Sequence, residues 1–132
     1  MFKKFIPYAV AESIYDIDIS FFKKNNVKTL LVDLDNTLDS YRLFKPLEHA
    51  YILKDNLEKN DIKLIVVSNN RGKRVSSYAN ALGVPYISSA RKPFAGKIKK
   101  FLKENNINVD EAMFVGDQMM TDVQAAHKAG LR

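Results

Sequence analysis

Four short apolar segments alternate along the chain with longer segments that carry apolar residues at helical spacing. This alternation constrains the fold more than any other feature of the sequence. The apolar segments cover residues 28–34, 63–67, 84–87 and 112–115. The longest are continuous apolar runs, which is typical of strands buried on both faces of a parallel sheet. The pattern predicts a single α/β domain over residues 1–132, with a parallel sheet and helices on both faces.

The segments between the predicted strands are predicted to be helices with one apolar face. Their apolar residues recur three or four positions apart: Leu47, Ala50, Leu53 and Leu57; Val75, Tyr78, Ala79 and Leu82; Phe94, Ile98, Phe101 and Leu102. The pairs Asn60–Asp61 and Asn105–Asn106 predict the ends of the first and third helices, and Gly83 predicts the end of the second. A last helix is predicted to begin near Thr121.

The composition limits the chemistry. The chain has no cysteine and two histidines, which excludes disulfides, thiolate metal sites and three-histidine zinc sites. The net charge of +6 favours phosphorylated or polyanionic partners or an anionic membrane surface, and a solubilising lysine-rich surface explains it equally well.

Two carboxylates, Asp33 and Asp35, lie where the first predicted strand ends. A carboxylate can attack a phosphate ester, and a second one nearby can protonate the leaving oxygen and then deprotonate water. Paired carboxylates also favour Mg²⁺. A similar pair, Asp16 and Asp18, does not follow a buried strand and is predicted to start a helix.

Polar residues follow the other predicted strands. These are Ser68 and Asn69 after the second strand, Lys92 before the third helix, and Asp117 with Asp122 after the fourth strand. In parallel sheets, ligands bind at the carboxyl edge, so these residues and the acidic pair are predicted to converge there.

The order of these motifs resembles that of the haloacid dehalogenase-like (HAD) superfamily of phosphatases. The narrower pattern is similar to the YqeG-type branch of subclass IIIA, which is related to phosphatidylglycerophosphate phosphatases. It consists of residues 5–7, the hexad 33–38, residues 67–70 and 90–93, and Gly116-Asp117-Gln118 with Thr121-Asp122. The resemblance implies a HAD-like Rossmannoid fold of three layers.

The resemblance also implies roles for these residues. Asp33 would be the nucleophile and a Mg²⁺ ligand, and Asp35 the general acid and base, with its carbonyl on the metal. Ser68 and Lys92 would bind the phosphoryl group. Asp117 would be a further metal ligand, with Asp122 ligating the metal or orienting its ligands.

Two further expectations follow from the length of the chain and the spacing of its motifs. Family members commonly continue past residue 132 with another apolar strand, so the fourth predicted strand is expected to lack its outer neighbour. The spacings from Asp35 to Ser68 and from Ser68 to Lys92 leave no room for a cap domain. We therefore expect an open site that accepts bulky substrates.

The sequence thus favours a Mg²⁺-dependent phosphomonoesterase acting on phosphatidylglycerophosphate or another bulky phosphomonoester. The alternatives are a soluble sugar-phosphate or nucleotide phosphatase, and a catalytically silent module that binds nucleic acid or the ribosome. No nucleic-acid partner is expected, because the aromatic residues fall at core positions. We expect a cytoplasmic protein that can contact anionic membranes through lysines beside apolar residues, namely Lys3, Lys4, Lys97, Lys99, Lys100 and Lys103.

Overall fold

The computed structural model describes residue 15 and residues 18–34, 45–68, 73–88, 94–116 and 119–122. Within these ranges the chain forms, in order, α1 (Ile19–Lys24), β1 (Thr29–Asp33), α2 (Glu48–Lys59), β2 (Lys63–Val67), α3 (Lys73–Leu82), β3 (Tyr86–Ile87), α4 (Phe94–Glu104), the 3-10 helix η2 (Val109–Glu111), β4 (Ala112–Gly116) and β5 (Met119–Asp122). The four predicted strands and the first three predicted helices are all confirmed.

The strands form one sheet in the order β3-β2-β1-β4-β5. Strand β1 lies at its centre, parallel to β2 on one side and to β4 on the other, and β3 is parallel to β2. The predicted parallel sheet is therefore confirmed for β1 to β4. Because the chain moves outward from β1 in both directions, the sheet has a switch point between β1 and β4.

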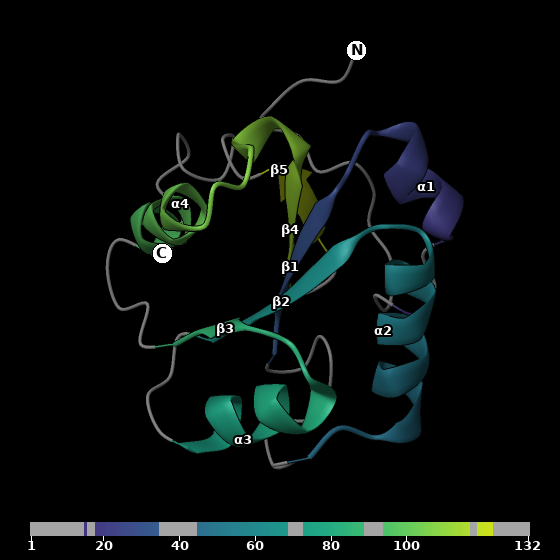
Figure 1. Cartoon of the computed structure of the whole chain (residues 1–132), viewed down its shortest axis with the longest axis vertical. Helices are drawn as coiled ribbons and strands as arrows, with labels where there is room; N and C mark the ends of the chain where they lie inside the picture. Colours follow the sequence, from purple (N-terminus) through teal and green to yellow (C-terminus); the bar gives the residue numbers. More distant parts are fainter. Residues whose placement is uncertain are drawn as a thin grey trace.

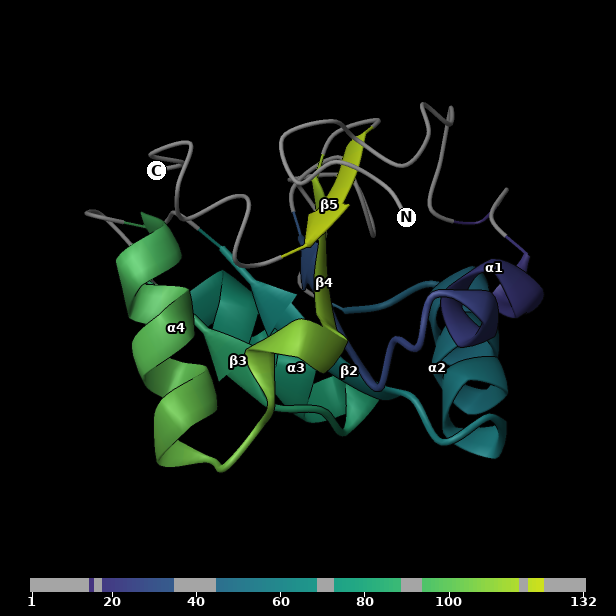
Figure 2. The ribbon, with the colours of Figure 1, turned by 90° about the horizontal axis from the view of Figure 1, so that it is seen from above.

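Helices cover both faces of the sheet, as predicted (Figures 1 and 2). On one face, Leu30 and Val32 of β1 join a core cluster with residues of α1, α2 and α3. On the other face, Leu31 of β1 joins a second cluster with Ile98 and Leu102 of α4. Alternate side chains of β1 thus pack into two separate cores, which explains why the strand is apolar along its buried length.

The apolar faces of the helices are largely as predicted. All four predicted apolar residues of α3 are buried, and so are Ala50, Leu53 and Leu57 of α2. Leu47 is the exception, because it precedes the first turn of α2 and is 48% exposed.

Three helices end in the same way, with an asparagine followed by a residue of positive φ. Asn26, Asp61 and Asn106 have φ of 58°, 60° and 58°. The preceding asparagine in each case donates from its side-chain amide to a helix carbonyl at 2.8 Å. The next residue, which is apolar, closes the turn by donating its N–H to another carbonyl of the helix. Helix α3 ends instead at Gly83, with φ of 81°.

Three expectations, one about Asp18 and two about the last part of the chain, have clear outcomes. Asp18 caps α1 by accepting a hydrogen bond from the Ser20 N–H, so its predicted role at a helix start is confirmed. The start predicted for the last helix, near Thr121, is wrong, because residues 119–122 form β5. The rest of that predicted helix, residues 123–132, lies outside the described residues. The expectation that β4 lacks an outer neighbour is also wrong, since β5 pairs antiparallel with it. Residues 119–122 run antiparallel to β4, and pairing with this edge satisfies the hydrogen-bonding groups of their backbone.

Among the residues that the structure describes, no helix is long and apolar enough to cross a membrane.

Candidate active site

The carboxyl edge of the sheet is where the topology gathers the predicted site residues. Strand β1 ends at Asp33, Ser68 directly follows β2, and β4 ends at Gly116, the residue before Asp117. The switch point of the sheet lies at the same edge, between β1 and β4. Ligands of open α/β sheets bind in the crevice outside the carboxyl ends at such a point.

Asp33 has a position fixed by the sheet. It is the last residue of β1, is partly exposed, and pairs with Val67 of β2. The next residue, Leu34, still donates its N–H to the Val67 carbonyl at 2.8 Å. Asp33 follows the alternation of Leu31, so it belongs to the sheet face that α4 covers. Asp33 is therefore partly exposed at the carboxyl edge, and strand pairing fixes its backbone there.

Ser68 lies beside Asp33 on the neighbouring strand end. Its N–H donates to the Ile87 carbonyl at 2.9 Å, so this amide is used by the sheet. Ser68 is also buried, with 2% exposure. A contribution of Ser68 to phosphate binding would come from its hydroxyl. The structure thus brings together the ends of two strands, where Asp33 and Ser68 lie 35 positions apart along the chain.

Four other predicted site residues, Asp35, Asn69, Lys92 and Asp117, lie outside the described residues. Their roles in the site therefore stay predictions. No group of three potential metal-ligating side chains occurs among the residues that are described. The metal site expected from Asp33, Asp35 and Asp117 therefore stays a prediction.

Asp122 is placed differently from the expectation. It is the last residue of β5 and pairs with Met113, three residues before the end of β4. At about 3.3 Å per residue, its backbone is about 10 Å from the Gly116 end of that strand. Its role beside the metal ligands stays a prediction.

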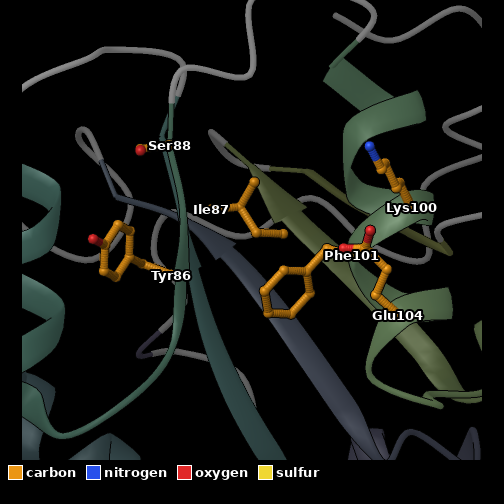
Figure 3. Close-up of a pocket in the computed structure, with 6 residues that line it drawn as sticks. All are labelled: Tyr86, Ile87, Ser88, Lys100, Phe101 and Glu104. Atoms are coloured by element: carbon orange, nitrogen blue, oxygen red, sulfur yellow. The ribbon is translucent and has the colours of Figure 1, made fainter.

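A pocket of about 390 Å³ opens between β3 and α4. Figure 3 shows Ile87 and Phe101 pointing toward one another across it, with Lys100 and Glu104 extending from α4. Ser88 and Tyr86 complete the lining. Sequence reasoning missed this pocket, because the two walls are contributed by elements that become neighbours only in the folded chain. From the sequence, Lys100 is predicted only to be part of a basic helix surface.

The model of the haloacid dehalogenase-like hydrolase family matches residues 1–132, the full length given. The chain belongs to this family. It shares 30% identity over 131 residues with the protein named "Probable phosphatase YqeG" of Bacillus subtilis (strain 168), which covers 98% of this chain and 76% of that protein. Both the family and the branch that the motifs predicted are confirmed.

Solved structures of HAD phosphatases share the fold. One is the cobalt-bound deoxy-D-mannose-octulosonate 8-phosphate phosphatase of Haemophilus influenzae, with a TM-score of 0.57 and 14% identity over 71% of this chain. Another is the 3-deoxy-D-manno-octulosonate 8-phosphate phosphatase of Moraxella catarrhalis with magnesium, phosphate and KDO, with a TM-score of 0.56 and 16% identity over 74% of this chain. The matches span 60% and 62% of those chains. Family membership and these names together support a phosphatase.

Proposed function

We propose that this protein is a Mg²⁺-dependent phosphomonoester hydrolase that works through an aspartyl-phosphate intermediate. The observation that carries the proposal is the position of Asp33. It is a partly exposed carboxylate at the carboxyl end of the central strand, beside the switch point and next to Ser68. Membership of the HAD-like hydrolases supports the reaction class.

The proposed reaction has two steps. An oxygen of the Asp33 carboxylate attacks phosphorus, and the bond from phosphorus to the ester oxygen breaks while Asp35 gives that oxygen a proton. Water then attacks the phosphorus of the aspartyl phosphate, and Asp35 takes the proton of the water. The bond from phosphorus to Asp33 breaks, which releases inorganic phosphate and restores the Asp33 carboxylate and the protonated Asp35.

A divalent cation fits the donor set. Asp33 supplies a partly exposed carboxylate at the sheet edge, and carboxylate and carbonyl oxygens are the ligands that Mg²⁺ prefers. Asp33, the Asp35 carbonyl and Asp117 would hold the ion. Bound there, it would offset negative charge on the phosphoryl group. The Ser68 hydroxyl and the Lys92 ammonium would orient the same group.

We further propose a bulky, lipid-linked phosphomonoester as the substrate, with phosphatidylglycerophosphate as the leading candidate. Between Asp33 and Ser68 the described residues form α2 and β2, and between Ser68 and Lys92 they form α3 and β3. These elements belong to the layers of the sheet, which supports an open site without a cap domain. Lys100 and Lys103 are exposed on α4, and each lysine near an anionic leaflet contributes about 1 kcal/mol.

A soluble sugar phosphate is the second candidate. It is favoured by the fold shared with two octulosonate 8-phosphate phosphatases. The two candidates predict opposite substrate preferences.

The test measures hydrolysis of p-nitrophenyl phosphate with and without Mg²⁺, followed by a panel containing phosphatidylglycerophosphate and soluble phosphomonoesters. Co-sedimentation with anionic and neutral vesicles at low and high salt accompanies it. The lipid proposal predicts fast turnover of the lipid and binding to anionic vesicles that high salt reverses. Indifference to both vesicle types, with faster turnover of a sugar phosphate, contradicts the lipid substrate and leaves the phosphatase proposal in place. No hydrolysis of any ester would instead indicate a silent binding module.

A further inference from the structure

The pocket between β3 and α4 is connected to Asp33 by the register of the sheet. Asp33 pairs with Val67, and Val67 pairs with Ile87, so the three residues form one row across β1, β2 and β3. Residues in such a row point to the same face. Two strand spacings of about 4.8 Å separate the ends of the row, so the backbones of Asp33 and Ile87 lie about 10 Å apart.

The same row links the pocket to Ser68. The carbonyl of Ile87 accepts the hydrogen bond from the Ser68 N–H, and Ser88 follows directly along the chain. Ile87 and Ser88 both line the pocket. The pocket thus adjoins the residue of β3 whose carbonyl holds the Ser68 N–H.

The lining combines three kinds of chemistry. Ile87 and Phe101 form an apolar wall, and Figure 3 shows these two side chains facing each other. Lys100 contributes an ammonium, which binds anions, and Glu104 contributes a carboxylate, which accepts hydrogen bonds from hydroxyl groups. Both are exposed, so a ligand can reach them from solvent.

We propose that this pocket receives the alcohol portion of the substrate, and that this portion carries a second negative charge together with free hydroxyl groups. The proposal rests on the phosphatase function proposed above. With phosphorus at Asp33, the alcohol portion extends over the carboxyl ends of β2 and β3 to the pocket, since Val67 in the row between them is buried in the core. The second anion binds the Lys100 ammonium, the hydroxyl groups donate to Glu104, and the carbon chain lies against Phe101. A phosphodiester in a lipid headgroup and a carboxylate on a sugar acid both supply such an anion.

The test compares two esters with the same three-carbon skeleton. 3-Phosphoglycerate carries a carboxylate on its alcohol portion, whereas glycerol 3-phosphate carries an uncharged hydroxymethyl group in its place. The proposal predicts that the wild-type protein prefers 3-phosphoglycerate in kcat/KM. Lys100→Ala should raise KM for 3-phosphoglycerate about tenfold and leave glycerol 3-phosphate unchanged, because a hydrogen bond to a charged group is lost.

Lys103→Ala is the matched control, since Lys103 is an exposed lysine on the same helix that does not line the pocket. It should leave both esters unchanged. Equal effects of the two substitutions, or no preference of the wild-type protein, overturn the proposal. Glu104→Gln should weaken the binding of both esters, since both have hydroxyl groups that donate to Glu104.

Two further arms separate the possible outcomes. Short-chain phosphatidylglycerophosphate and an anionic sugar phosphate, each assayed with both lysine variants, show which source of the anion the pocket prefers. If the wild-type protein hydrolyses no ester, the proposed function fails, and binding of glycerate against glycerol, measured by NMR, tests the pocket itself. Weaker glycerate binding in Lys100→Ala than in Lys103→Ala supports the pocket, and equal binding overturns it.

Discussion

Asp33 and Val67 are paired at the ends of two adjacent parallel strands, and the Leu34 N–H continues this ladder by donating to the Val67 carbonyl at 2.8 Å. The sheet itself therefore positions the candidate nucleophile. A reactive group held by strand pairing is placed more accurately than one on a loop. The pairing also brings Ser68, the next residue after Val67, to the side of Asp33.

Asp33→Asn should abolish turnover of p-nitrophenyl phosphate, because an amide cannot form the acyl-phosphate. Asp35→Asn should slow turnover roughly 10²–10⁴-fold through the loss of acid–base catalysis. Steady-state kinetics on the purified variants measures both effects.

The matched control for Asp33→Asn is Asp55→Asn, which removes an exposed carboxylate of α2 away from the sheet edge. It should retain wild-type activity. Wild-type turnover by Asp33→Asn would contradict the covalent mechanism.

Removal of divalent cations by EDTA should eliminate activity, and added Mg²⁺ should restore it. Ca²⁺ should substitute poorly, because it takes about 6–8 ligands in looser geometry and would misplace the nucleophile. Assays with each ion after dialysis measure the effect. Full activity of the chelated protein would show that the chemistry does not need a metal.

Gly83→Ala should lower the free energy of unfolding by about 1–2 kcal/mol, because φ of 81° is costly for a residue with a Cβ. The new Cβ would also lie 3.3 Å from the Lys54 Nζ, at the flexible end of that side chain, which can move away. Gly83→Asn should cost less, since asparagine tolerates this region. Urea denaturation measures both, and equal costs would argue against backbone conformation as the cause.

Asn106→Gly should raise the free energy of unfolding by a few tenths to about 1 kcal/mol, and Asn106→Ala should lower it by about 1 kcal/mol. The reason is the φ of 58° at the end of α4, which glycine adopts freely. Asn26→Gly at the end of α1 provides an independent repeat. Circular dichroism during urea denaturation gives the values, and a destabilised Asn106→Gly would contradict the prediction.

Most of the fold follows from local patterns in the sequence. The continuous apolar runs around Leu31 and Ile65 predict parallel strands that are buried on both faces. The helical spacing of Val75, Tyr78 and Leu82 predicts α3, a helix that is buried on one face. The end of α4 is also encoded locally, by Asn105–Asn106.

The features that could not be predicted depend on contacts between segments that become neighbours only in the folded chain. Residues 119–122 carry no strand pattern of their own and become β5 by pairing with the free edge of β4. The pocket between Ile87 and Phe101 exists because β3 and α4 lie side by side after folding. At the candidate site, the topology could be predicted from the order of the motifs. The use of the Ser68 N–H by the sheet could not, since it depends on the register of β2 and β3.

Helices α1, α2 and α4 each end at an asparagine, and a strand follows each of these ends along the chain. These helix ends therefore lie at the amino edge of the sheet, opposite Asp33 and Ser68. The parts of the chain that terminate its helices are thus separated from the parts that carry its proposed chemistry. Stabilising substitutions in many enzymes reduce activity because both properties depend on the same residues. Here an engineer can alter one edge for thermal tolerance and leave the other free to evolve new substrate preferences.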